Sequence, residues 1–212
     1  MTSAKQLFVR EDILLFKNHL NDKGHCHLKT FINFLNYNHV KRPLKFAYIS
    51  SNHQLIEGLT LKENILLDYI PSDLSTSKEH QFNSYMQKSE NTHLQKLFAQ
   101  ITLPDAYPSK VDRQMQQLAV FIKGLIQQSD FLFLERPEEF LSSENIVHII
   151  NAIEFNSKNS GQVVLLSTTL SDKWFNHITK IVTKSSAHCF EVAPVINQKS
   201  IIKIADHKKN VA

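Results

Sequence analysis

The chain has 212 residues, of which 42% are hydrophobic and 21% are charged, enough to build the core of a single domain. Lys and Arg (24) exceed Asp and Glu (20), but these positive charges are dispersed except near the C-terminus, so no basic stripe predicts a nucleic-acid partner. The apolar runs are far shorter than the ~20 residues of a membrane-spanning helix, so we expect no direct membrane insertion. With only Cys26 and Cys189 and no secretory signal pattern, we expect a reduced, cytoplasmic setting.

Four short segments, rich in aliphatic and aromatic residues and apolar on both faces, predict buried strands. They are residues 13–16, 45–50, 131–135 and 163–168. Strands buried on both faces are typical of a parallel sheet covered by helices. The sequence therefore predicts a mainly parallel core.

Helical segments lie between these strands, each with apolar residues at spacings of three and four. They are residues 27–35, 83–101, 112–128 and 143–155. Alternating strands and helices predict one α/β domain over residues 1–212, with an approximate helical subdomain at 71–115. Residues 183–212 are expected to form a C-terminal extension or hairpin.

Glycine is scarce, with four residues in the whole chain and only Gly24 among the first 57. A loop that cradles phosphate needs glycines, because a side chain would keep its backbone N–H groups away from the anion. The composition therefore disfavours such a loop.

Three segments, whose order and spacing agree over roughly two-thirds of the chain, resemble the ATPase domain of ABC transporters. Residues 46–67 are similar to the segment that follows that family's middle strand, and 107–144 to its signature motif, Walker B strand and D-loop. Residues 162–182 are similar to its H-loop strand. The resemblance implies a P-loop NTPase-like fold: a mainly parallel sheet flanked by helices, with a small helical subdomain. Only about a dozen residues separate Leu35 from Tyr48, so the family's β-subdomain is expected to be reduced.

The segment "NDKGHCHLKTFINFL" matches the family's Walker A loop, but its phosphate-binding residues are changed. One register places Thr30 at the hydroxyl position and Leu28 at the lysine, whereas a shift by one restores Lys29. In either register His27 or Leu28 replaces the final glycine. A side chain there would block the approach of the phosphates, so we expect no working cradle.

Two further positions of the family's active site are altered. Ser51 stands where the family has a glutamine that senses magnesium, and its shorter side chain cannot span the same gap. Asp112 falls in the signature motif, where its carboxylate would repel a γ-phosphate. The alternative reading of Asp112 is structural, because Asp is a favoured N-cap for the helix that follows.

The segment "FLFLERPEEFL" matches the Walker B strand, whose Asp and catalytic Glu become Glu135 and Arg136. Glu135 could still face a metal, with altered geometry. Arg136 removes general-base catalysis, since a guanidinium has no acceptor and stays protonated. Arg136 would bind an anion or a partner carboxylate, or would pair locally with neighbours such as Glu138. Thr168 replaces the H-loop histidine.

The sequence predicts neither a metal site nor a cofactor. The cluster of His19, His25, Cys26 and His27 lacks the spacing of paired metal ligands. We do not expect ATP or Mg²⁺ to bind, although Lys29, Thr30 and Glu135 leave open a reading as a static nucleotide site without hydrolysis.

These changes predict a pseudo-ATPase, not an enzyme. The first hypothesis is a catalytically inactive ABC-ATPase-like subunit of a bacterial transport or secretion complex, peripheral on the cytosolic face of the inner membrane. Its partners would be a membrane permease subunit, another ABC ATPase-like subunit, or both. The second hypothesis is a soluble adaptor or scaffold without permease or nucleotide. Candidate partner contacts, each of which could equally be core, are Leu55, Ile56, Leu59 and Leu61.

Overall fold

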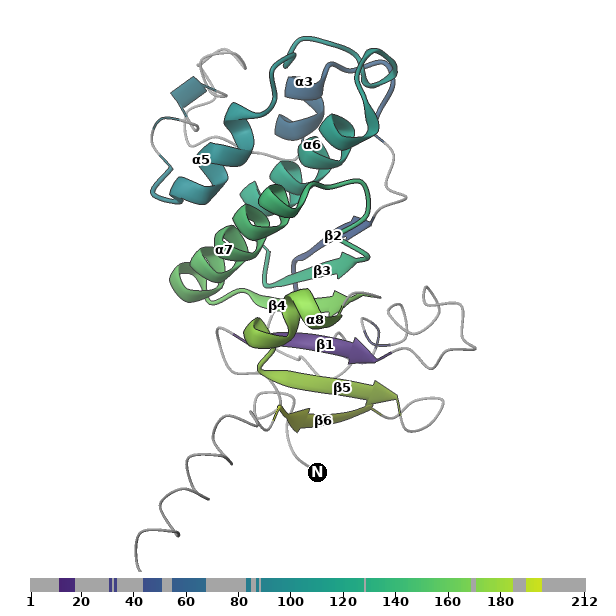
Figure 1. Cartoon of the computed structure of the whole chain (residues 1–212), viewed down its shortest axis with the longest axis vertical. Helices are drawn as coiled ribbons and strands as arrows, with labels where there is room; N and C mark the ends of the chain where they lie inside the picture. Colours follow the sequence, from purple (N-terminus) through teal and green to yellow (C-terminus); the bar gives the residue numbers. More distant parts are fainter. Residues whose placement is uncertain are drawn as a thin grey trace, which may run out of the picture.

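The computed structural model contains one six-stranded sheet with the strand order β2-β3-β4-β1-β5-β6 (Figure 1). It describes residues 12–17, 31, 33, 44–50, 55–67, 83–84, 87, 89–127, 129–168, 171–184 and 190–195. The strands are β1 (Ile13–Lys17), β2 (Phe46–Ser50), β3 (Phe131–Glu135), β4 (Val163–Ser167), β5 (Lys180–Lys184) and β6 (Phe190–Pro194).

Five strands of the sheet run parallel, and β6 alone pairs antiparallel with β5. All four strands predicted from the sequence are present, within a residue or two of the expected bounds. Strands β3 and β4 are buried along almost their whole length because helices cover the sheet, which explains their apolar sequences. The prediction of an α/β fold with a mainly parallel sheet is confirmed.

The helices are α3 (Leu61–Leu66), α5 (Thr92–Ala99), α6 (Arg113–Ile126), α7 (Ser143–Ser160) and α8 (Ser171–Trp174), with short 3₁₀ turns at Pro108–Lys110 and Phe175–His177. In Figure 1, α3 and α5 lie at the top, beyond the edge strand β2. The long helix α7 ends at Gly161, which adopts φ 69° and donates its N–H to Ser157. This left-handed cap suits glycine, which has no Cβ to clash.

The predicted helix at 83–101 is not continuous, because residues 89–91 are non-helical and α5 begins only at Thr92. Asn91 caps α5, with its side-chain oxygen accepting the N–H of Leu94 at 3.0 Å. Its amide nitrogen donates to the Ala152 carbonyl of α7, also at 3.0 Å. The contact with α7 and the cap thus fix Asn91 in a non-helical conformation, although the apolar periodicity predicts a continuous helix.

Two apolar layers cover the two faces of the sheet. The larger joins α3, α5, α6 and α7 to one face, and its tightest point is Gly124 of α6, where an added Cβ would lie 2.4 Å from Ile49 of β2. The smaller layer is rich in aromatic rings. Phe31 belongs to it, with its ring centre 5.9 Å from that of Phe16 and 5.0 Å from that of Phe190. Phe31 and Asn33 are the described residues of the predicted helix 27–35, and both are helical.

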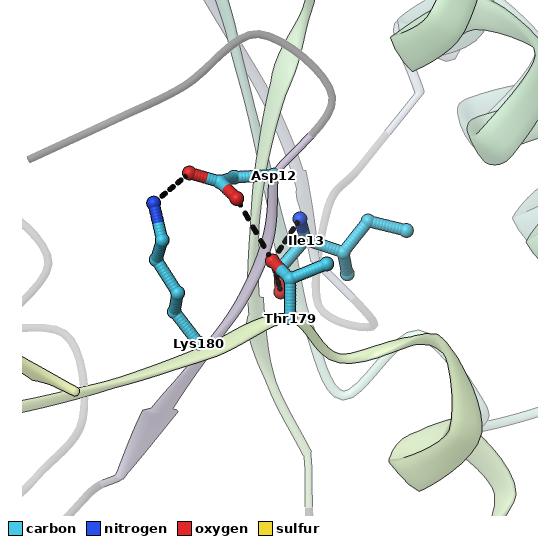
Figure 2. A network of polar contacts seen from close by, with 4 residues as sticks. All are labelled: Asp12, Ile13, Thr179 and Lys180. Carbon is cyan, nitrogen blue, oxygen red and sulfur yellow. Dashed lines mark hydrogen bonds and ion pairs between the residues drawn. The ribbon is translucent and has the colours of Figure 1, made fainter. Parts of the chain in front are cut away.

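Strands β1 and β5 are fastened at their amino ends by a polar network (Figure 2). The Thr179 hydroxyl accepts the N–H of Ile13 and donates to Asp12 Oδ1, both at 3.1 Å. Lys180 Nζ lies 2.5 Å from Asp12 Oδ2. Asp12 is buried, and these partners replace the water that its carboxylate would otherwise contact. The network lies at the amino ends of the strands. Proteins with this class of fold bind ligands at the opposite side, the carboxyl ends.

The structure describes parts of the two segments for which subdivisions are predicted. Within 71–115, the described residues form α5, the Pro108–Lys110 turn and the start of α6. Strands β5 and β6 form an antiparallel pair that spans the expected start of the C-terminal hairpin at 183. Residues 36–43, where a reduced β-subdomain is expected, lie outside the described residues.

Candidate functional site

The candidate site lies at the carboxyl ends of β2, β3 and β4. Ser50, Glu135 and Ser167 are in register across these three strands. Because the strands are parallel, their carboxyl ends meet at one edge of the sheet, the usual place for a ligand site in this class of fold. The loop after β3 and the residue after β4 therefore lie close together.

Glu135 is held by hydroxyl groups of the neighbouring strand. Its Oε2 accepts hydrogen bonds from Tyr48 and, at 3.2 Å, from Ser50. Burial first, and then the hydrogen bond and charge of Glu135, raise the pKa of the Tyr48 phenol above its ordinary value. Tyr48 therefore keeps its proton and acts as a donor. One oxygen of the carboxylate is thus directed back at β2.

Arg136 follows directly and adopts a left-handed backbone conformation, with φ 45°. Its N–H donates to the Ser167 carbonyl at 2.7 Å, which continues the contact between β3 and β4 beyond the strands. Its guanidinium Nη1 donates to Glu139 Oε1 at 2.9 Å. The local ion pair expected for Arg136 is therefore present. Its partner is Glu139 and not Glu138, the neighbour named above as an example.

Glu138 instead accepts the hydroxyl of Thr168 at 2.6 Å. Glu138 is 7% exposed, so this carboxylate is held inside the loop and not displayed to solvent. Thr168, which the sequence analysis matches to an H-loop histidine, is therefore bonded to the loop that follows β3. This contact joins the ends of β3 and β4 a second time.

Asp112 is the N-cap of α6, with Oδ1 accepting the N–H of Met115 at 2.8 Å. Asp112 therefore has the role of a helix N-cap, which is the structural alternative given above. Beside it, the guanidinium carbon of Arg113 lies 5.1 Å from the ring centre of Phe140, a cation–π contact between α6 and the loop after β3. Phe140 has φ 64° and is about half exposed. Two bulky residues of this loop, Arg136 and Phe140, thus occupy a strained backbone region.

The remaining predicted nucleotide-site positions, Leu28, Lys29, Thr30 and Ser51, lie outside the described residues, as does the histidine and cysteine cluster at 19–27. Within the described part of the chain, no three His, Cys, Asp or Glu side chains gather closely enough to hold a metal ion. Among the helices that the structure describes, none combines the length and apolar composition that crossing a bilayer requires.

The candidate partner-contact residues divide by burial. Leu55 and Leu61 are buried in the core, whereas Ile56 is 50% exposed and Leu59 is half-buried. Asn64 of α3 fixes this segment: its Oδ1 accepts the N–H of Ile56 at 2.8 Å, and its amide nitrogen donates to three carbonyls of residues 56–60. The exposed Ile56 therefore projects from a rigid support.

A second apolar strip lies beside this segment. The N–H of Leu61 donates to Ala106 at 2.9 Å, and the N–H of Lys62 donates to Pro104 at 2.8 Å. The loop thus attached carries Leu103 and Tyr107, each about half exposed. No periodic pattern marks residues 103–107, so burial alone reveals this strip.

Tyr48 and Ser50 were also not predicted as site residues. A signal for them does exist, because side chains alternate along a strand and residues 48 and 50 lie on one face of β2. Placing them next to Glu135 requires the register between β2 and β3, which no local pattern specifies.

Solved structures with a similar fold include ATP-binding subunits of ABC transporters, although no family model and no curated protein matches the sequence. A dimeric ATP-binding cassette in a post-hydrolysis state, bound to ADP and Pi, aligns with TM-score 0.65 and 12% identity over 90% of this chain and 89% of that one. An inward-facing, putative metal-chelate type ABC transporter aligns with TM-score 0.60 and 13% identity over 87% and 72% of the two chains.

The ATP-binding subunit of an ABC transporter aligns with TM-score 0.59 and 15% identity over 82% of this chain and 75% of that one. Identities this low say nothing about activity, and they support the fold alone. The chain has the α/β fold of ABC-transporter ATPase domains, of the P-loop NTPase type.

Proposed function

We propose that this chain is a catalytically inactive, ABC-ATPase-like subunit of a membrane-associated transport or secretion complex, and that it acts through contacts with other proteins. The observation that carries the proposal is Arg136 at the end of β3. A guanidinium offers donors and no acceptor, so it cannot take a proton from an attacking water. Its ion pair with Glu139 gives this side chain a structural role instead.

The residues at the carboxyl edge also fit Mg-ATP poorly. Magnesium prefers oxygen ligands in a near-ideal octahedral arrangement. Here Glu135 Oε2 already accepts two hydroxyl groups from β2. The next residue adds a positive charge to the same edge. We therefore assign no step of the protein's action to a bound nucleotide or metal.

The loop at the start of α6 supports the same reading. The carboxylate of Asp112 caps the helix, so a negative charge stands where an ABC signature motif offers neutral donors to phosphate. Like charges at about 4 Å repel by roughly 4 kcal/mol at a near-surface dielectric. A partner ATPase subunit would therefore gain little nucleotide affinity from this surface.

The surface proposed for the partner contact consists of Ile56, Leu59, Leu103 and Tyr107, called here the 56/107 surface. Its two segments are joined by backbone hydrogen bonds and by the Lys62–Asp105 ion pair at 2.7 Å. Exposed apolar side chains on a rigid support suit the docking of a partner helix. We propose that a cytosolic helix of a permease subunit binds here, which would place the chain on the cytosolic face of a membrane.

Capture of partners under mild detergent tests this proposal. The tagged wild-type chain should recover an integral membrane protein, and Ile56→Asp or Tyr107→Asp should abolish that recovery. Val147→Asp is the matched control, because Val147 is 54% exposed but lies on α7, outside the 56/107 surface. Recovery of soluble proteins only, or equal loss in all three variants, would contradict the permease partner.

A second candidate function, a soluble adaptor without a permease, is favoured by the Arg113–Phe140 contact. This contact ties the start of α6 to the loop after β3 within one chain. A subunit that completes a partner's nucleotide site would need this loop to face the partner. Recovery of soluble proteins that depends on Ile56 and Tyr107 would support the adaptor.

A further inference from the structure

Two histidines face each other where the helical part of the molecule meets the core. His93 lies on α5 and His148 on α7, with their Nδ1 atoms 3.3 Å apart. The ring centres are 5.6 Å apart, and the ring planes are inclined by 39°. The nitrogens are closer than the ring centres by about two ring radii, so the two Nδ1 atoms point at each other. In a hydrogen bond between the two rings, one Nδ1 carries the proton and donates, and the other Nδ1 accepts the hydrogen bond.

The pair belongs to a polar seam between α5 and α7. One turn away, Asn91 donates to Ala152 and to Asn156 Oδ1, each at 3.0 Å. Asn156 in turn donates to the Leu125 carbonyl of α6 at 2.9 Å. These bonds connect α5, which leads toward the 56/107 surface, with α6 and α7, which cover the sheet. Loosening the seam would weaken the attachment of α5 to α7 and leave its buried apolar residues, Leu94, Leu97 and Phe98, to hold it on the core.

Among the described residues, few charges surround the pair. His148 Nε2 lies 3.9 Å from Glu144 Oε1 on α7, but Glu144 is 79% exposed and screened by solvent. On α5, Lys96 adds a positive charge. Burial first, and then the charges of His148 and Lys96, lower the pKa of His93 below its ordinary value. Arg113 and Lys123 on α6, which also packs against α5, are not among the causes of this lowering.

We propose that His93 and His148 form a pH-sensitive latch that holds α5 on α7 and opens when both rings become positively charged. The closed pair tolerates at most one extra proton, on the Nε2 of the donor ring. A second one would place protons on both facing Nδ1 atoms and add like charges. The separated rings take up two protons.

The direction of the pH effect follows from this proton count. Because the open state binds more protons, acid favours it by linkage. The latch contributes stability above the ordinary histidine pKa of about 6.5, and this contribution is lost as the pH falls below that value. The proposal is independent of nucleotide and of the partner, so its failure would leave the proposed function untouched.

The first test is a proton NMR titration of the histidine rings in the full chain, with EDTA present to remove metal ions. In the wild type, the second protonation of the pair should occur below the ordinary histidine range. In His148→Gln, which removes the facing charge, His93 should titrate closer to the ordinary value. His177→Gln is the control, because His177 contacts Glu154 on α7 and not the pair. Independent, ordinary titration of both rings in the wild type would overturn the latch.

The second test is hydrogen exchange of the α5 amides, corrected for intrinsic rates, at pH 7.5 and 5.5. The wild type and His177→Gln should show an increase in α5 opening of about threefold or more at the lower pH. The single variants His93→Gln and His148→Gln should show little increase. An increase of equal size in all four proteins would also overturn the proposal, since it would not come from the pair.

Discussion

The guanidinium of Arg136 lies 2.9 Å from the carboxylate of Glu139, three residues further along the loop after β3. Both side chains are about one-third exposed, so the ion pair contributes only about 0.2–1 kcal/mol. The pair matters for where it lies. It holds a cation at the position that the resemblance to ABC ATPases assigns to the catalytic base.

The first prediction concerns the inverse substitution. Arg136→Glu should not create ATPase activity, because Asp112 and Thr168 keep their structural bonds and because we expect the segment that resembles a Walker A loop to lack phosphate-binding residues. The measurement is phosphate release from Mg-ATP by the purified variant, whose melting temperature confirms that it is folded. Turnover above that of the wild type would show that a single residue had blocked the site.

Much of the fold was predictable because its signals are local. The strands at 131–135 and 163–167 are apolar runs, and Asp112 is an N-cap by residue type and position. The Tyr48–Glu135 contact was not predictable, because the two residues are 87 positions apart and only the sheet register brings them together. The break before α5 was missed for a similar reason, since Asn91 is fixed by α7. The capping box formed by Thr60 and Glu63 at the start of α3 also has a local sequence signal, a Thr followed three residues later by a Glu.

The second prediction concerns Tyr48. The folded state holds its phenolic proton more tightly than the unfolded chain, in which tyrosine titrates near pH ~10. This stabilisation is present below about pH 10 and is lost as the pH rises further. Tyr48→Phe should be less stable by about 1.5–3 kcal/mol at neutral pH, because it loses a hydrogen bond to a charged group.

Between roughly pH 9 and pH 11 the same variant should lose less stability than the wild type, as measured by urea unfolding. Tyr107→Phe is the matched control, because Tyr107 is 50% exposed and belongs to the loop attached to α3. If Tyr48→Phe and Tyr107→Phe follow the same pH curve, the Glu135 contact does not contribute as described.

The third prediction concerns the packing of α6 on the sheet. In Gly124→Ala the new Cβ would lie 2.4 Å and 2.6 Å from two atoms of the fully buried Ile49. Overpacking of this kind costs about 1–3 kcal/mol, and the better helix propensity of Ala offsets about 1 kcal/mol. We expect a net loss of up to about 2 kcal/mol by chemical denaturation. Gly58→Ala, where nothing lies within 4 Å, should be close to neutral.

The fourth prediction concerns the amino-end network of β1 and β5. Asp12→Ala removes the acceptor for both Thr179 and Lys180 and should destabilise the fold by about 2–3 kcal/mol. Replacing the exposed Lys173 of α8 by Ala should change stability by less than about 0.5 kcal/mol. Equal effects of the two substitutions in thermal unfolding would mean that the network in Figure 2 adds no stability.

The most direct test of the central claim is ATP turnover by the wild-type chain, alone and with its captured partner, compared with Glu135→Gln. Glu135 ends β3 at the carboxyl edge, and the resemblance to ABC ATPases implies the metal position for this residue. The account predicts no turnover and no thermal shift with millimolar Mg-ATP in either protein. Turnover that is present in the wild type and lost in Glu135→Gln would contradict it, because contaminating activity would not respond to this substitution.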